Sequence, residues 1–228
     1  MNVAAVSTET PSSTLGLPIQ QEVNHVIEEL MTELPDPKQL SADQRRGIIA
    51  RYAAVLEGNF IYWMTGAYLS VKSERARAII LENLHEEVRD SHPRMLRTFV
   101  LCANAAPTDT DAFAIHADLT NVRLFVGRLS ACRILTMMAF FEGFIQRFMA
   151  YLAEIALAQG SNEFEYTDVH GVCDIEHTAG LFRALGAETA LHPPEVISDL
   201  FEGVNLLSSL IRTIVEPAEQ PRALAHAG

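Results

Sequence analysis

Apolar residues along most of the chain recur every three or four positions, which is the spacing of an amphipathic α-helix. No segment alternates apolar and polar residues with enough β-branched side chains to predict a strand. The pattern therefore predicts an all-α bundle. Functional sites in such bundles are built from side chains that face the central axis.

Prolines, glycines and capping residues divide this pattern into separate helices. Pro18 begins the first helix, Ser73 caps a later one and Gly160 ends the longest. A residue before proline disfavours helical geometry, so His92 in front of Pro93 marks a break. The predicted helices cover residues 18–34, 42–71 with a bend near Gly58, 73–87, 93–103, 120–159, 167–185 and 194–215, with a short extra helix at 112–116.

The two ends of the chain differ in composition from the helical middle. Residues 1–17 are rich in Ser, Thr and Pro, and residues 217–228 are similarly polar and proline-containing, so both are predicted to be disordered. One domain is expected between them, over residues 18–216. The first residues lack a basic start followed by an apolar run, so no signal peptide is predicted.

Composition and charge restrict the possible partners. The chain has 228 residues, 49% of them hydrophobic, and a formal net charge of -12. This charge argues against nucleic acids and anionic membranes, whereas a single arginine suffices to bind a substrate carboxylate. The apolar stretch 134–148 is too short and too often interrupted by polar residues to cross a bilayer. Three cysteines without a C-x-x-C pair favour a reduced, cytoplasmic protein.

The clearest candidate for chemistry lies on the predicted helix 167–185. His170, Asp174 and His177 are separated by four and three residues, which places them at about 0°, 40° and -20° around a helix. Their side chains therefore point the same way. Two imidazoles and a carboxylate form one half of a mixed nitrogen and oxygen metal site. The alternative interpretation is a solvated polar face.

Two further segments carry candidate ligands. Glu142 lies among apolar residues, where an unpaired carboxylate is costly and needs a metal or a salt-bridge partner. Glu87 continues the apolar face of its helix, and His92 follows the break and can turn back toward it. Glu86 lies about 100° around the helix from Glu87 and is its main competitor.

Taken together, three carboxylates and three imidazoles are too many ligands for a structural zinc ion, which normally has four. Hard carboxylates combined with imidazoles suit a pair of iron or manganese ions. The candidate metal ligands are Glu87, His92, Glu142, His170, Asp174 and His177.

These motifs resemble the haem-oxygenase-like diiron oxidases and oxygenases. That family has a Glu closing an Asn-Leu-x-x-Glu run, a His shortly after, a Glu on a long central helix and a late His-x-x-x-Asp-x-x-His. Here these positions are Glu87, His92, Glu142 and the segment 170–177. The resemblance implies a seven-helix haem-oxygenase-like bundle that binds two Fe ions and uses O2 as co-substrate. The short gap between Glu87 and His92 leaves the choice between Glu86 and Glu87 open.

The resemblance also implies a reaction class. Relatives act on amino acids or fatty acids, so a small carboxylate-bearing substrate, an external electron donor and a homodimer are expected. N-oxygenating relatives carry an extra carboxylate about 26 residues before the first ligand, and Glu57 is only the nearest acid to that position. Oxidation at carbon is therefore expected, by hydrogen abstraction leading to C–C cleavage, desaturation or nitrile formation in a natural-product biosynthetic pathway.

Candidate substrate contacts are aromatic residues and one cation. Phe141, Tyr62 and Trp63 are predicted to line the pocket, although ordinary core packing explains most such aromatics equally well. Arg212 lies in an apolar run and is the candidate partner of a substrate carboxylate, unless its stem packs on the surface with its head in water.

Three rival functions remain open on the same scaffold. A haem-binding protein would use His25 as its axial ligand, and a thiaminase-like hydrolase would use Cys173 as its nucleophile. A self-modifying diiron protein would consume one of its own side chains in a single turnover, with Tyr62 or Tyr68 as donor.

Overall fold

The computed structural model describes residues 13–216, with side chains from Gly16 onward, so the predictions for residues 1–12 and 217–228 lie outside the described residues. Within this range the chain forms α-helices and one 3-10 helix and no strand, which confirms the predicted all-α class. The elements are α1 (Ser13–Glu33), α2 (Ala42–Leu56), α3 (Asn59–Ser70), α4 (Glu74–Arg89), α5 (His92–Cys102), α6 (Asp109–Val126), α7 (Ala131–Ala158), α8 (Glu165–Leu191), η1 (Ile197–Phe201) and α9 (Glu202–Val215).

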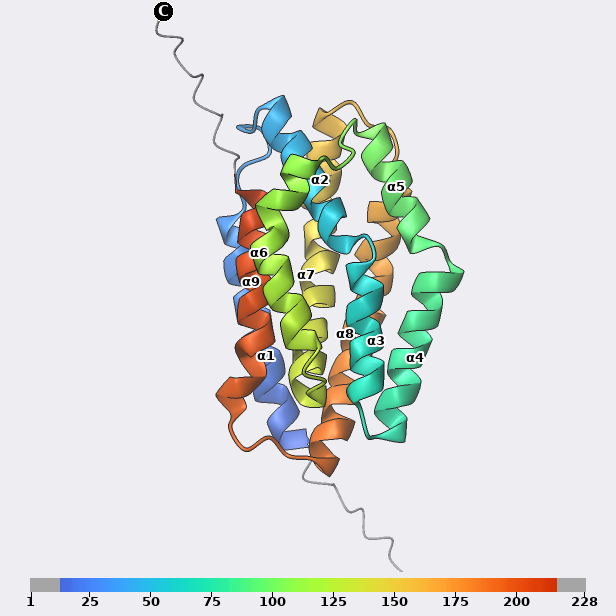
Figure 1. Ribbon diagram of the computed structural model, residues 1–228, viewed down its shortest axis with the longest axis vertical. Helices are drawn as coiled ribbons and strands as arrows, with labels where there is room; N and C mark the ends of the chain where they lie inside the picture. The colour runs from blue at the N-terminus through green and yellow to red at the C-terminus, as the bar shows by residue number, and fades with distance from the viewer. Residues whose placement is uncertain (1–12, 217–228) are drawn as a thin grey trace, which may run out of the picture.

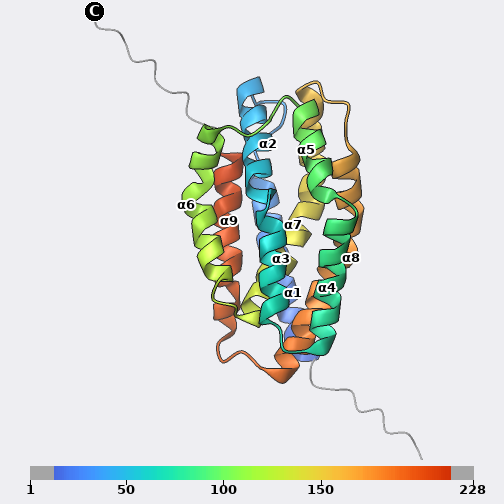
Figure 2. The same ribbon diagram turned by 45° about the vertical axis from the view of Figure 1, so that its right-hand side comes forward.

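The helices run mostly along the long axis of the molecule, around α7 (Figure 1). Helix α7 packs against α1, α3, α8 and α9, and its pairing with α8 is the most extensive in the fold. Helices α6 and α9 lie together on one side, and α4, α5 and α8 lie on the other (Figure 2). The apolar stretch 134–148 noted in the sequence therefore lies on the central helix of the bundle.

Two predicted helices are each divided in the structure. The segment 42–71 bends at Gly58, as expected, and the bend separates α2 from α3 because Gly58 adopts a left-handed φ of 78°. The segment 120–159 was wrongly predicted as one helix. The chain turns at residues 127–130, so α6 extends from Asp109 to Val126, far beyond the short helix predicted there. Apolar spacing continues on both sides of this turn, which conceals it in the sequence.

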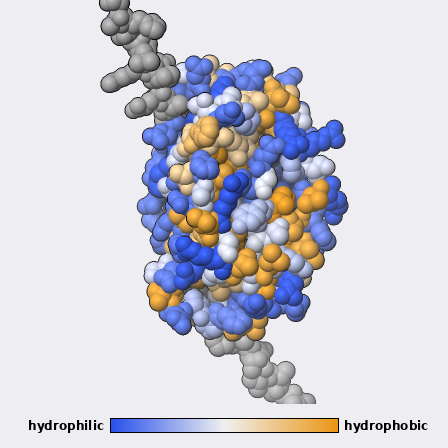
Figure 3. Space-filling model, in the orientation of Figure 1, coloured by the Kyte–Doolittle hydropathy of each residue, from blue (hydrophilic) through white to orange (hydrophobic). Residues whose placement is uncertain are grey.

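The core is continuous from one side of the bundle to the other. It contains Trp63, Tyr52, Phe99 and Phe125 together with the aromatic side chains of α7, all with little or no exposed surface. The surface seen in Figure 3 has apolar residues scattered among hydrophilic ones. In the part of the chain that the structure describes, no helix combines the length and apolarity needed to cross a membrane.

Candidate metal centre

Four helices bring the predicted ligands into the interior of the bundle. Glu87 comes from α4, His92 from the start of α5, Glu142 from α7, and the other three from α8. Their exposed fractions range from 0% for Asp174 to 6% for His170. Six polar or charged side chains this deeply buried need partners, because an unpaired charge away from water is costly.

The turn between α4 and α5 returns the chain to the site. Ser91 adopts a left-handed φ of 61°, and Pro93 occupies the first turn of α5. The turn places Nδ1 of His92 2.8 Å from Oε1 of Glu87. An Nδ1–H donated to Glu87 leaves Nε2 of His92 with its lone pair.

His170 completes a first group of ligands with Glu87 and His92. Candidate donor atoms of the three residues lie within 4.8 Å of one another. Nδ1 of His170 lies 2.8 Å from the backbone oxygen of Tyr166, one turn earlier on α8. This hydrogen bond leaves Nε2 available to bind a metal ion, an arrangement common in metal-binding histidines. Burial lowers the pKa of His170 to about 4, so the ring is neutral at physiological pH.

Asp174, His177 and Glu142 form a second group beside the first. Nδ1 of His177 lies 3.7 Å from Oε2 of Glu142 and 3.7 Å from Oδ1 of Asp174. These separations are too long for hydrogen bonds. Oε1 of Glu142, Oδ2 of Asp174 and Nδ1 of His177 are all buried and have no hydrogen-bond partner among the described residues.

The second group places two buried carboxylates beside one imidazole, and this arrangement shifts the pKa of all three groups. Burial raises the pKa of Glu142, and burial together with the neighbouring Glu142 raises that of Asp174. Burial by itself lowers the pKa of His177, but the neighbouring carboxylates of Glu142, Glu86 and Asp174 outweigh it and raise that pKa to about 10. The protonated His177 is thus the cation that balances these acids in the absence of metal.

The residues present fit bound metal ions. Three buried atoms without a hydrogen-bond partner in the described part of the chain, two of carboxylates and one of an imidazole, belong to side chains that meet at His177. Each carboxylate lies 3.7 Å from Nδ1 of His177, and a bound cation would satisfy such atoms. Carboxylate oxygens and imidazole nitrogens are the donors that iron accepts in bundles of this kind. The structure thus brings together the six residues predicted from the sequence.

Glu86 and Cys173 also reach the second group. Oε2 of Glu86 lies 2.8 Å from Nε2 of His177, and its side chain remains 34% exposed. The thiol of Cys173 donates a hydrogen bond to Oδ1 of Asp174 over 3.2 Å. Burial, reinforced by Asp174, raises the pKa of this thiol, so Cys173 is protonated and supports Asp174 instead of serving as a nucleophile.

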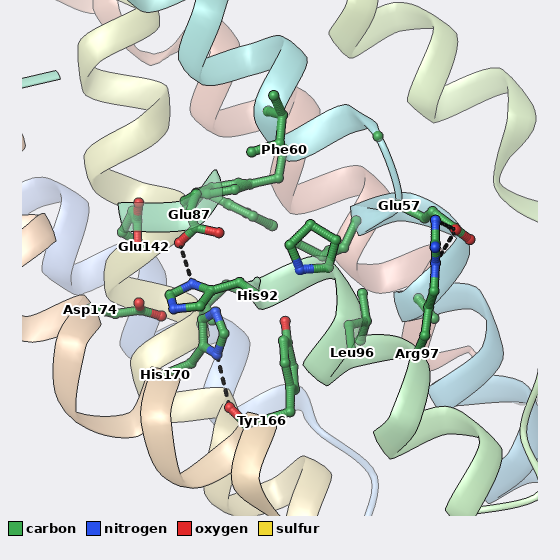
Figure 4. A pocket seen from close by; sticks show the side chains of 17 residues that line it. Glu57, Phe60, Glu87, His92, Leu96, Arg97, Glu142, Tyr166, His170 and Asp174 are labelled. Atoms are coloured by element: carbon green, nitrogen blue, oxygen red, sulfur yellow. Dashed lines mark hydrogen bonds and ion pairs between the residues drawn. The ribbon is translucent and has the colours of Figure 1, made fainter. Parts of the chain in front are cut away.

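A cavity of about 50 Å³ leads from the surface to these ligands (Figure 4). Glu87, His92, Glu142, His170 and Asp174 form its inner end. Apolar side chains of α2, α3, α5 and α7 form its walls, among them Leu56, Phe60, Leu96, Phe141 and Ile145. At the inner end of the cavity, a small molecule would contact the ligand residues directly and otherwise mainly apolar side chains.

Two of the four predicted substrate contacts belong to this region. Phe141 lines the cavity, and Trp63 packs edge-on behind it with ring centroids 5.2 Å apart. Tyr62 does not line it, because its side chain turns to the surface, where its hydroxyl donates to the backbone oxygen of Arg123. Arg212 does not line it either. It forms an ion pair with Glu33 over 2.8 Å at a separate hollow between α1 and α9.

His25 does not offer a buried haem ligand. Its side chain is 64% exposed and lies 3.3 Å from Glu29 on the outer face of α1. An axial ligand would have to face the interior of the bundle, so the haem interpretation has no support at this position.

Tyr166, Arg97 and Glu57 line the cavity and were not identified from the sequence as contributors to it. Tyr166 precedes His170 by four residues and shares its helix face, a signal that the spacing argument could have detected. Arg97 and Glu57 lie on different helices, and only the folded bundle brings them together.

Comparisons with known proteins agree with this geometry. A family model described as iron-containing redox enzyme matches residues 49–210, which include all six candidate ligands. No curated protein shows significant sequence similarity to the chain.

Proposed function

The chain belongs to the family of iron-containing redox enzymes, and we propose that it is a non-haem diiron oxidase or oxygenase acting on a small substrate that carries a carboxylate. The observation that carries the proposal is the group of unsatisfied buried atoms on Glu142, Asp174 and His177, beside a second complete group of donors. The first group offers its own set of candidate donor atoms in addition to the second, which favours two ions.

The two ions would be held by different parts of the bundle. Glu87, His92 and His170 would hold one ion, and Asp174 and His177 would hold the other. The carboxylate of Glu142 lies close enough to His177 to share in the second group, and it also faces the cavity. Bound iron would supply O2 activation and one-electron chemistry, with reducing electrons from an external donor.

The protein itself supplies position and a dry environment. The apolar walls of the cavity exclude water, which protects a reactive site from side reactions. His170 is already neutral and oriented by the Tyr166 carbonyl, so it needs no rearrangement to bind a cation. A substrate carbon at the inner end of the cavity would be held next to the ligands, which supports oxidation at carbon by hydrogen abstraction.

The position of Glu57 weighs against an N-oxygenase. Figure 4 places Glu57 beside Arg97, at the end of the cavity away from Glu142 and Asp174. It therefore cannot supply an additional metal ligand without a large movement of the α2–α3 junction.

A self-modifying, single-turnover protein is the second candidate. The ring of Tyr166 lies 4.3 Å from that of His170, between centroids, and its hydroxyl shares a 2.7 Å hydrogen bond with Tyr52. A side chain this close to the ligands is a possible internal substrate. More than one product molecule per chain, with no change in the mass of the protein, would exclude this candidate.

The proposal is tested by anaerobic loading of the metal-free protein with ferrous ion. We expect about two irons per chain, and Asp174→Asn is expected to lower this number. Asp168→Asn serves as the matched control, because Asp168 is an exposed carboxylate on the same helix. Uptake of one zinc ion and no iron would refute the proposal.

A further inference from the structure

A cation and an anion stand together at the outer end of the cavity. Nε and Nη2 of Arg97 lie 2.8 Å and 2.7 Å from Oε1 of Glu57, and both residues line the cavity. Their side chains are 65% and 48% exposed. Exposed pairs of this kind contribute little to stability, so the pair separates at low cost when a better partner arrives.

The pair spans two independent parts of the bundle. Glu57 is the C-cap residue of α2 and is followed by the left-handed Gly58, whereas Arg97 lies on α5. Helix α5 begins at the ligand residue His92, so Arg97 lies roughly 8 Å further along the helix axis at 1.5 Å per residue. In Figure 4 this pair lies at one end of the cavity, and Glu142 and Asp174 lie at the other end.

The size and walls of the cavity restrict what can lie between the two ends. A volume of about 50 Å³ has room for roughly four water-sized groups, at 10–15 Å³ for each. Leu96, Phe60 and Phe141 make this path largely apolar between its ends, and the hydroxyl of Tyr166, which also lines the cavity, already shares a hydrogen bond with Tyr52. A slender, unbranched apolar chain of a few carbons fits this space.

The charges at the mouth determine the head group of such a molecule. A carboxylate alone would bind Arg97 but face the displaced carboxylate of Glu57, and an amine alone would face the displaced guanidinium. A head group with both charges satisfies both residues at once. We propose that Glu57 and Arg97 bind the ammonium and carboxylate groups of an α-amino acid whose apolar side chain extends to the metal ligands. This inference rests on the proposed function for the nature of the inner end.

One consequence concerns the position of reaction. With its head group at the mouth, the amino acid presents the end of its side chain to Glu142 and Asp174, and its α-carbon stays near the surface. Oxidation then occurs on the side chain and leaves the amino and carboxylate groups intact.

The test uses three probes of equal chain length: norleucine, hexanoate and hexylamine. Trp63 is the only tryptophan of the chain and packs against Phe141 on the cavity wall, so its fluorescence reports occupancy. Binding is measured on the full chain, both metal-free and anaerobically loaded with ferrous ion, and is checked by calorimetry. Norleucine is expected to bind about tenfold more tightly than either other probe, since each lacks one charged hydrogen bond.

Two single variants assign the two charges. Arg97→Gln should weaken norleucine and hexanoate about tenfold and leave hexylamine unchanged or tighter. Glu57→Gln should weaken norleucine and hexylamine and leave hexanoate unchanged or tighter. Arg94→Gln is the control, because Arg94 is exposed on the same helix and does not line the cavity.

The outcomes separate this inference from the proposed function. Equal binding of all three probes, or hexanoate binding more tightly than norleucine, would overturn the head-group assignment. Weakening of every probe by both variants would show that the pair only maintains the shape of the mouth, which also overturns it. None of these results depends on iron uptake, so failure of the diiron proposal would appear separately in the metal analysis.

Discussion

Glu86 accepts a hydrogen bond from Nε2 of His177 over 2.8 Å, so Nδ1 is the nitrogen that faces Glu142 and Asp174. A carboxylate that holds the outer nitrogen of a metal-binding histidine fixes its tautomer and ring orientation. We therefore propose that Glu86 positions His177 and that Glu87, which is buried beside His92, is the ligand.

The first prediction distinguishes these neighbouring glutamates. Glu87→Gln should abolish iron binding at the first group. Glu86→Gln should retain both irons but weaken uptake about 10-fold to 100-fold. It should also shift the pH dependence of uptake to lower pH, because Glu86 helps to raise the pKa of His177. Metal titrations at pH values from about 6 to about 9 measure both the affinity for iron and its pH dependence. Equal loss of iron in both variants would make Glu86 a ligand as well.

The second prediction concerns turnover. His177→Ala and Glu142→Ala should abolish O2-dependent product formation, since each removes a donor of the second group. Helical circular dichroism should remain close to that of the unmodified protein, because α7 and α8 keep their apolar contacts. Full activity of Glu142→Ala would show that α7 does not contribute to the centre.

The third prediction concerns the stability of the metal-free protein. Burial and the neighbouring Glu142 raise the pKa of Asp174 in the folded state, so its carboxyl keeps a proton that the unfolded chain loses above about pH 4. This difference lowers the free energy of unfolding above that pH. This cost grows as the pH rises from about 4 toward the folded pKa. Asp174→Asn removes it, and the variant should be more stable than the original by about 1–3 kcal/mol at neutral pH.

Urea unfolding at a series of pH values tests this stability prediction. The difference between Asp174→Asn and the original protein should shrink as the pH falls to about 4 and below, because the carboxyl then becomes protonated in the unfolded chain as well. Ferrous ion should stabilise the original protein more than the variant, which retains a complete set of donors in the first group only. A variant that is less stable than the original at neutral pH would contradict the electrostatic argument.

The fourth prediction concerns the product. Oxidation at carbon should give a cleaved, unsaturated or nitrile product, and deuterium at the reacting carbon should slow its formation. Mass spectrometry of the product distinguishes these outcomes. A hydroxylamine or nitroso product would instead support the N-oxygenase alternative.

Much of the interior was predictable because it depends on helical periodicity. His170, Asp174 and His177 share one face of α8 for purely geometric reasons, and the apolar neighbours of Glu142 correctly indicate its burial. Local rules also identified the break before Pro93 and the bend at Gly58.

Contacts between distant helices were not predictable in the same way. Arg212 was expected at the substrate because it lies in an apolar run, but its helix presents it to Glu33 on α1. The pairing of Arg97 with Glu57 depends on how α5 packs beside the end of α2, and no local pattern records that packing. The turn between α6 and α7 was missed because apolar spacing continues through it.

The division of the ligands among α4, α5, α7 and α8 has a consequence for the life of the protein in the cell. No single helix or hairpin holds all six proposed donors, and the first group combines α4 and α5 with α8. Under the proposed function, the full iron content therefore cannot be reached until most of the chain has been synthesised and packed. Iron content then acts as a measure of correct folding. A substitution that loosens the packing of α7 against α8, far from any ligand, should appear first as lost iron and only later as aggregation or degradation.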